Sequence, residues 1–268
     1  ESDLAGKLQF FYVRDPLGVT NGEDGETFEP VDLADIWGEP VIMLMGPDVS
    51  PDRNILAATL TTVISLACVA IFSIEAFGNT ADVMNRVQTA QEMNDYDLTW
   101  LDDRVAPVFL SIVATQVAHE IAHQIFAFKG KFKTCAPTFI PSPTLPQLTS
   151  ITKIKTPPRN LRDLFDFAAA GPIVGMLTSV ALLVYGAAET NAMDAASYAM
   201  LPSLSLDIIK SSSLGANIIN SFMDNQVLVQ NAPSIVPLHP AAIAGFCGLI
   251  INALSLLPIG QSDGGRIA

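Results

Sequence analysis

Residues 105–128, VAPVFLSIVATQVAHEIAHQIFAF, combine a long apolar stretch with two histidines and a single charged side chain, Glu120. A helix crosses a bilayer with about 20 apolar residues, so this stretch is long enough to span one. A charge in the middle of a span costs about 2.5–3.5 kcal/mol on insertion scales, and such residues usually have a function or a partner. The stretch therefore predicts a membrane helix that carries chemistry.

Three further stretches, 54–74, 167–188 and 241–259, contain no charged residue. Any one of them could be a buried core helix, but four apolar stretches joined by polar loops favour a polytopic membrane protein. Of the 268 residues, 50% are hydrophobic and only 15% are charged, whereas soluble domains have about a quarter. We predict a mainly α fold, a membrane helix bundle with at least four spans. The spans are expected at about 54–77, 105–128, 165–187 and 240–259.

The basic residues indicate how the bundle is oriented. Residues 129–162 hold seven of the 14 basic residues and no acidic residue. Short basic loops stay on the cytoplasmic side of a membrane, or on its organelle equivalent. The second span then ends inside, and the acidic loop 79–104 lies outside. Because successive spans alternate in direction, the first span starts inside and the fourth span returns inward.

Residues 1–50 differ from the rest of the chain, because they contain 11 acidic and two basic residues. Residues 7–13 and 40–45 read as short strands flanked by turn residues, including Asn21-Gly22. We predict an acidic soluble segment of small α/β structure at 1–50, followed by a membrane-embedded domain at 51–268. Because the chain starts at Glu1 and stops soon after a Gly-Gly-Arg sequence, it is expected to be a fragment or a processed chain, incomplete at its C-terminus.

Two classes of function are disfavoured by composition. The net charge of −13 argues against nucleic-acid binding, which needs clustered Lys and Arg to neutralise phosphates. The three cysteines are far apart and show no CxxC spacing, so the sequence suggests neither a disulfide framework nor a cysteine-based zinc site. Six prolines between 134 and 158 exclude a regular helix there, and the alternating β-branched residues of 148–155 predict an extended strand.

The sequence His119-Glu120-Ile121-Ala122-His123 has the HExxH pattern. On a helix, residues i and i+4 share one face, so both imidazoles can bind one metal ion and the adjacent glutamate can reach a water on it. The alternative is a histidine pair satisfied by hydrogen bonds between helices. Lys129 is ten positions after His119, which places the site roughly 15 Å below the inner surface at about 1.5 Å per residue.

A catalytic zinc site needs a third protein ligand and an open position for water. The remaining histidine, His239, should lie at the outer end of the fourth span, far from the other two. Asp263 is the better candidate, because the fourth span returns inward and Pro258 and the following glycines break the helix before it. The alternative is that Asp263 is a solvated turn residue.

Taken together, these motifs resemble the site-2 protease family of intramembrane zinc metalloproteases. Within that family, the chain is most similar to the plastid branch called ethylene-dependent gravitropism-deficient and yellow-green proteases. HExxH occurs in many metalloproteases, but HExxH, AGPxxG and LPxxxxDGGR in this order are specific. The matching segments are HEIAH (119–123), FIPS (139–142), LFDFAAAGPIVG (164–175), HPAAIAGFCGL (239–249) and LPIGQSDGGR (257–266).

The resemblance implies a zinc metalloendopeptidase in a plastid membrane, acting on membrane-protein substrates within the lipid bilayer. It implies that His119, His123 and Asp263 bind Zn²⁺, and that Glu120 is the general base for a water activated by the metal. Such proteases cleave in or near membrane-spanning segments, which must unwind locally. We hypothesise that the 148–155 strand, with Ile151 and Ile154, pairs with the unwound peptide.

The chain departs from the family at one polar position. The family commonly has asparagine three positions before the proline of the last motif, whereas this chain has Ser255 there and its nearest asparagine is Asn252. A serine donates one hydrogen bond where an amide offers two, so ligand orientation or the oxyanion contact is expected to differ. For Gly171, Pro172 and Gly175 plain helix packing is the first interpretation.

Two other classes of function stay open. A protease-like membrane scaffold would bind partners or metal without cutting, and Ser255 is the one feature that favours it. A metal transporter is a poorer fit, because the first and third spans have no ionisable residue to continue a polar pathway across the bilayer.

Overall fold

The computed structural model describes residues 9–15, 39–45, 54–94, 97–223, 227–229 and 234–268. It is mainly helical, which confirms the predicted fold class. The helices are α1 (Ile55–Glu75), α2 (Ala81–Met93), α3 (Thr99–Gly130), α4 (Leu161–Ala192), α5 (Ala195–Tyr198), α6 (Leu206–Lys210), α7 (Ser213–Phe222), α8 (Pro240–Ser255) and α9 (Asp263–Ile267). The strands are β1 (Gln9–Asp15), β2 (Glu39–Met45), β3 (Thr138–Ile140), β4 (Thr149–Ile151), β5 (Ser203–Ser205) and β6 (Ile235–Pro237).

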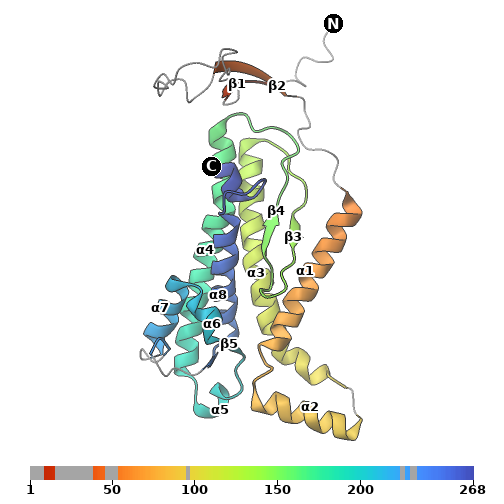
Figure 1. The fold of residues 1–268 in the computed structure, drawn as a ribbon, viewed down its shortest axis with the longest axis vertical. Helices are drawn as coiled ribbons and strands as arrows, with labels where there is room; N and C mark the ends of the chain where they lie inside the picture. The colour runs from red at the N-terminus through yellow and green to blue at the C-terminus, as the bar shows by residue number, and fades with distance from the viewer. Residues whose placement is uncertain (1–8, 16–38, 46–53, 95–96, 224–226, 230–233) are drawn as a thin grey trace, which may run out of the picture.

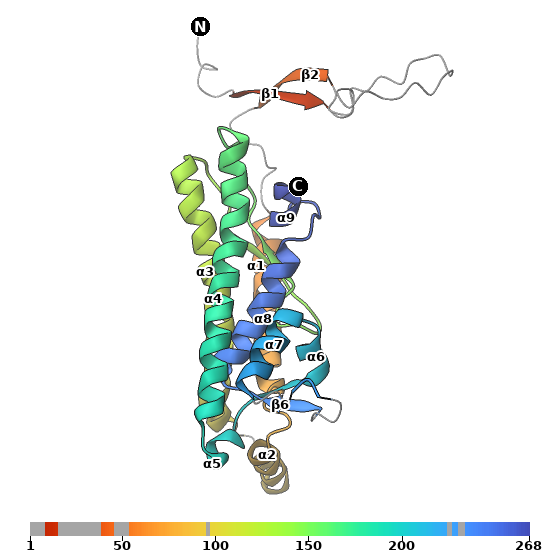
Figure 2. The same ribbon diagram turned by 90° about the vertical axis from the view of Figure 1, so that its left-hand side faces the viewer.

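The core of the molecule is formed by α3, α4 and α8, which lie side by side in both ribbon views (Figures 1 and 2). Helix α4 begins where the Asn160 side chain accepts a hydrogen bond from the Asp163 backbone N–H at 2.8 Å. Helix α8 begins with Pro240, whose fixed φ suits a first helical position. The core side chains include the fully buried Val108, Ile112, Leu183, Ile243 and Phe246.

Three of the described helices are long and apolar enough to cross a membrane: α1, α3 and α4. They match three of the four predicted spans. The fourth, predicted at 240–259, is the shorter helix α8 of 16 residues, or about 24 Å, so the count of at least four spans is not confirmed. Leu256 caps α8 and the chain then turns, because Pro258 follows two residues later. Most of α8 is buried by other helices, which agrees with the alternative interpretation of this stretch as a buried core helix.

The small sheets are three antiparallel strand pairs. β3 pairs with β4, from Thr138 opposite Ile151 to Ile140 opposite Thr149, and an isolated bridge joins Thr134 to Ile154. An extended strand within 148–155 is therefore confirmed at Thr149–Ile151 and at the Ile154 bridge. The β3–β4 hairpin lies between α1 and the three-helix core, with β3 against α1 and β4 against α8 (Figure 1).

The N-terminal region is described only as the β1–β2 pair, close to the two predicted strands. The residues that the structure describes there account for the strands of the predicted α/β segment, and its helical part stays a prediction. The predicted Asn21-Gly22 turn lies outside the described residues. The division at residue 50 stays a prediction.

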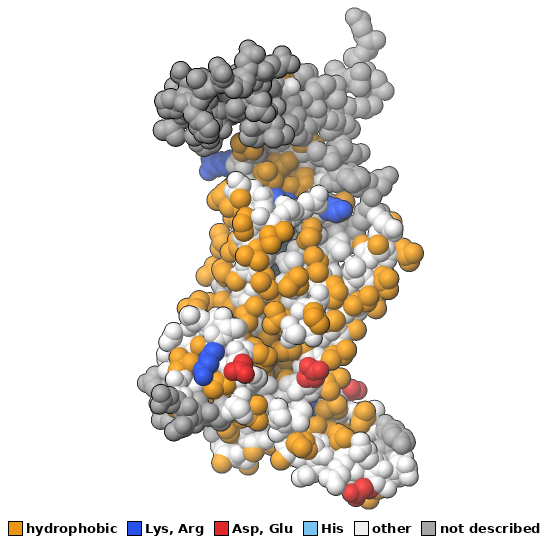
Figure 3. Space-filling view, viewed as in Figure 1, with side chains coloured by type: hydrophobic (Ala, Val, Ile, Leu, Met, Phe, Trp, Pro, Cys, Tyr) orange, Lys and Arg blue, Asp and Glu red, His pale blue; other side chains and the backbone are white. Residues whose placement is uncertain are grey.

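Charged side chains gather at the two ends of the helix bundle. On the face shown in Figure 3, most Lys and Arg lie near the end where α4 begins, while acidic side chains and one basic side chain lie near the opposite end, and apolar side chains cover the middle. The ends of α3 and α8 and the starts of α1 and α4 all lie toward the basic end (Figure 1), as the predicted alternation requires.

Candidate metal centre

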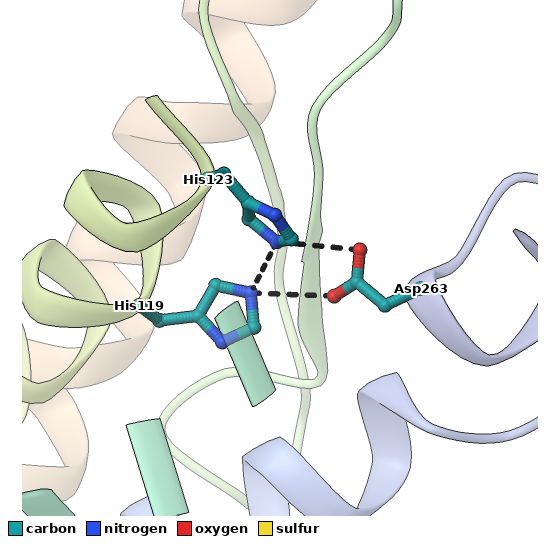
Figure 4. Close-up of side chains that lie close together, drawn as sticks. All are labelled: His119, His123 and Asp263. Atoms are coloured by element: carbon teal, nitrogen blue, oxygen red, sulfur yellow. Dashed lines mark hydrogen bonds and ion pairs between the residues drawn. The ribbon is translucent and has the colours of Figure 1, made fainter. Parts of the chain in front are cut away.

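Helix α3 presents His119 and His123 on one face, one turn apart, and both side chains are buried. Asp263, from the first turn of α9, points between them (Figure 4). Its Oδ2 lies 3.3 Å from His119 Nε2 and its Oδ1 lies 3.3 Å from His123 Nε2, while the two Nε2 atoms are 3.0 Å apart. These are the ligand atoms of one group, all within 4.8 Å of one another.

The loop after α8 brings Asp263 back to the histidines. The Ser262 hydroxyl donates to the Leu257 carbonyl at 2.7 Å and accepts from the Gly265 N–H at 3.2 Å, so it closes the loop and caps α9. Gly264 leaves no room for a Cβ, which would collide with the Leu256 carbonyl. The glycine after Asp263 thus permits the tight turn of the chain that brings the Asp263 carboxylate back to the histidines.

Hydrogen bonds at Nδ1, the ring nitrogen that faces away from the centre, fix the orientation of both imidazoles. His123 Nδ1 lies 2.8 Å from the Phe167 carbonyl, which can only accept, so this nitrogen carries the hydrogen. His119 Nδ1 lies 2.7 Å from Asn252 Oδ1, and the amide of Asn252 donates to the Gly248 carbonyl at 2.8 Å. With this assignment of the amide, His119 also carries its hydrogen on Nδ1. Both Nε2 atoms then present lone pairs to the centre.

This arrangement fits a metal cation. Two Nε2 lone pairs and a carboxylate face each other with no hydrogen between them, and Asp263 Oδ2 is buried without a hydrogen-bond partner. Without a cation or an added proton, such a set of acceptors would repel. Two imidazoles, a carboxylate and one open position are the donor set of a catalytic zinc site, and hydrogen bonds from Nδ1 to carbonyl oxygens are how such ligands are oriented.

Two glycines of α4 make room for the centre. A Cβ on Gly171 would collide with the Nε2 atoms of His123 and His119, and one on Gly175 would collide with the Asn252 side chain. The sequence interpretation of plain helix packing therefore misses what these glycines pack against. They allow α4 to pass directly behind the imidazoles.

Glu120 lies beside the centre, buried to 7% exposure. Its Oε2 accepts a hydrogen bond from the Thr152 hydroxyl at 2.6 Å, while its Oε1 is buried without a partner. Glu120 also lines a cavity of about 330 Å³ between α3 and residues 134–139. The carboxylate therefore has one free oxygen and an adjoining space in which a water or a peptide can lie.

The remaining predicted residues take different places. Ser255 is buried and donates to the Asn252 carbonyl of its own helix at 2.8 Å, whereas Asn252 contacts His119. Ile151 lines a cavity of about 260 Å³ beside α1, and Ile154 packs near Phe132 and Phe167. His239 caps the far end of α8, as expected.

Sequence reasoning did not single out Thr152 or Arg266. Arg266 Nη2 donates to the Thr152 carbonyl at 2.7 Å, its Nη1 lies 3.5 Å from Asp263 Oδ1, and its guanidinium lies over the Phe167 ring. Thr152 follows β4 and is 2% exposed. Two features of the sequence could have indicated these residues. Arg266 belongs to the DGGR motif, and Thr152 lies in the predicted strand.

Comparison with known proteins gives consistent similarities. Residues 107–268 match the sequence model described as "Peptidase family M50". The chain is 31% identical over 167 residues to a rice (Oryza sativa subsp. japonica) protein named "Probable zinc metalloprotease EGY1, chloroplastic", covering 60% of this chain and 27% of the relative. It is 31% identical over 173 residues to the Arabidopsis thaliana protein of the same name, covering 61% and 29%.

A rice (Oryza sativa subsp. indica) protein named "Probable zinc metalloprotease EGY2, chloroplastic" is 31% identical over 156 residues, covering 56% of this chain and 26% of the relative. The chain thus spans less than a third of the length of these relatives. No solved structure matches the chain.

Proposed function

Because the chain belongs to peptidase family M50, we propose that it is an intramembrane zinc metalloprotease, which hydrolyses peptide bonds in or near membrane-spanning segments. The family membership confirms the resemblance to the site-2 proteases. The observation that supports the activity best is the convergence of His119, His123 and Asp263, with the buried carboxylate of Glu120 next to His119 in the sequence.

His119, His123 and Asp263 would hold the zinc ion. When bound, zinc supplies Lewis-acid chemistry, because it polarises a carbonyl and lowers the pKa of a coordinated water to near neutrality. The histidines are held for this task by Asn252 and by the Phe167 carbonyl, which keep both Nε2 lone pairs directed inward.

Glu120 would act as the general base. Its Oε2 is engaged by Thr152, so Oε1 is the atom that accepts a proton from water and later passes it to the leaving amine. The cavity next to Glu120 is lined mostly by apolar groups and would limit the water that reaches the reacting bond.

The substrate would be a membrane protein whose segment unwinds next to the hairpin. A helical backbone hides its carbonyl carbons, and a strand offers the unwound peptide replacement hydrogen bonds. Ile151 and Ile154 lie on either side of Thr152, the residue of this extended segment that contacts Glu120. Proline at either position would remove a backbone donor, and we expect less cleavage with unchanged zinc content.

We also propose that the chain resides in a plastid membrane. The support is the three helices long enough for spans and the word "chloroplastic" in the names of the relatives.

The deciding experiment compares the parent with Glu120→Gln in lipid nanodiscs. Zinc content and cleavage of a model transmembrane substrate are measured on the same preparations. We expect one zinc per chain in both proteins and cleavage only by the parent, since Gln cannot take a proton. Lack of cleavage by the parent would contradict the proposal and favour the non-proteolytic scaffold.

A further inference from the structure

Thr152 and Arg266 form a chain of contacts that ends on the general base. The Thr152 hydroxyl donates to Glu120 Oε2 at 2.6 Å, and the Thr152 carbonyl accepts from Arg266 at 2.7 Å. Arg266 lies on α9 with Asp263, one turn further along. The helix that carries the third metal ligand thus also fixes the segment that contacts Glu120.

We propose that Thr152 and Arg266 are positioning residues for Glu120. A glutamate side chain can rotate about three bonds, and the two ends of its carboxylate are equivalent until one is bound. Thr152 binds Oε2, and Oε1 has no hydrogen-bond partner. Arg266 acts through Thr152, because its guanidinium holds the backbone from which the hydroxyl projects. This inference rests on the proposed protease function.

The same contact restricts how a substrate can pair with the hairpin. The Thr152 carbonyl already accepts a hydrogen bond from Arg266, so an added strand would compete with the guanidinium for this oxygen. Strand addition would therefore use positions on either side of Thr152. A substrate that paired at Thr152 itself would displace Arg266 and release Glu120.

Matched variants at Thr152 test the proposal. Thr152→Val has the same shape without the hydroxyl, and Thr152→Ser keeps the hydroxyl. We expect Thr152→Val to retain zinc and KM while kcat falls about tenfold to a hundredfold, since small displacements of a catalytic group have effects of this order. Thr152→Ser should restore most of kcat. Arg266→Gln should lower kcat similarly, with Thr152→Val adding little to it.

The outcomes separate this proposal from the protease function. A parent that does not cleave would contradict the function. An active parent whose Thr152→Val variant stays within twofold in kcat would overturn the positioning role alone. So would a Thr152→Ser variant as impaired as Thr152→Val at equal zinc content, because a structural defect would then explain both.

A separate observation concerns two lysines at the basic end. Lys133 and Lys155 lie opposite each other beside the Thr134–Ile154 bridge, with the Lys155 N–H donating to the Lys133 carbonyl at 2.7 Å. Like charges opposite each other destabilise paired strands. Neither lysine has an ion pair among the described residues. Both line a cavity of about 510 Å³ together with Phe128, Phe132 and Ala127.

We infer that this cavity binds the headgroup of an anionic lipid. The two ammonium groups would share one phosphate or sulfonate, and the acyl chain would lie on the apolar side of α3. Phe128, Ile125 and Ile121 are exposed there, at 87%, 58% and 53%. Clusters of basic residues beside a span bind anionic headgroups in this way. A free anion would use the lysines but not the exposed apolar side chains.

Native mass spectrometry in nanodiscs tests the site. Nanodiscs of phosphatidylcholine with a minority of phosphatidylglycerol should give the full chain with one retained anionic lipid. The double variant Lys133→Gln/Lys155→Gln should retain it about tenfold less, whereas Lys129→Gln/Lys131→Gln, which removes the same charge outside the cavity, should retain it like the parent.

Three results would overturn the lipid site. One is an absence of anionic lipid on the parent, as expected if the acidic residues of 1–50 neutralise the lysines instead. Another is an equal loss in both double variants, which would indicate unspecific attraction by the basic band. The third is displacement of the lipid by millimolar inorganic phosphate, which would indicate a site for a free anion.

Discussion

Helices α1 and α8 are both strongly apolar in sequence, yet they lie in different surroundings. On α1, large side chains such as Leu56 and Leu60 are 79% and 58% exposed. On α8, which packs against α4 and α3, Ile243 and Phe246 are fully buried. Apolar composition alone therefore does not distinguish a helix that faces lipid from one that is enclosed by protein.

Small residues account for much of the difference. A Cβ on Gly245 would collide with the α4 backbone at Leu183, and one on Gly248 would collide with the Ser179 hydroxyl. Helix α1 has no glycine, so it cannot approach a neighbour as closely. The close approach of α8 to α4 also brings Asn252 to His119. The enclosed helix orients the metal centre, whereas α1 covers one side of the hairpin.

The largest expected difference between the two regions concerns their carboxylates. Asp263→Ala, beyond the end of α8, removes a ligand and leaves two, so zinc should be lost and cleavage should become undetectable. Glu75→Ala, at the end of α1, should keep one zinc per chain. Zinc content by mass spectrometry and cleavage of a model substrate check this pair, and zinc retention by Asp263→Ala would contradict the assigned site.

Adding a methyl group to each helix should reveal the packing contrast. Gly245→Ala forces α8 away from the α4 backbone and should destabilise the protein by about 1–3 kcal/mol. The matched variant Val63→Ile extends an exposed side chain of α1 by one methyl group and should change stability by less than about 0.5 kcal/mol. Thermal unfolding in detergent measures both. Equal stability of the two variants would mean that α4 and α8 are loosely packed.

Within α8, the two buried polar side chains should differ in effect. Asn252→Ala removes the acceptor that orients His119 and should weaken zinc binding about 10- to 100-fold. Ser255→Ala removes a bond within the helix and should leave zinc binding nearly unchanged. Competition with a zinc chelator measures the affinity. A stronger effect at Ser255 would restore the role that the family resemblance suggested for that position.

The smallest effect is expected on the exposed side of α1. Leu60→Ala should cost less than about 0.5 kcal/mol in detergent, because no cavity is left in a packed core. A loss above about 2 kcal/mol in the same unfolding assay would show that this side of α1 is packed against protein.

By itself, the sequence determined three membrane-length helices, the helical spacing of His119 and His123, and the family. These features are local, since apolar length and i, i+4 spacing are readable along one segment. The mainly α fold and the strand near residue 150 followed from the same kind of local pattern.

Only the tertiary structure decided which distant residues meet. Asp263 lies 140 positions after His123 and contacts it because the loop after α8 folds back, and Thr152 reaches Glu120 from a separate hairpin. It also decided that 240–255 is enclosed by protein, and that Gly171 leaves room for two imidazoles. Contacts of this kind depend on how helices pack against one another, and one segment's sequence does not contain the shape of its neighbour.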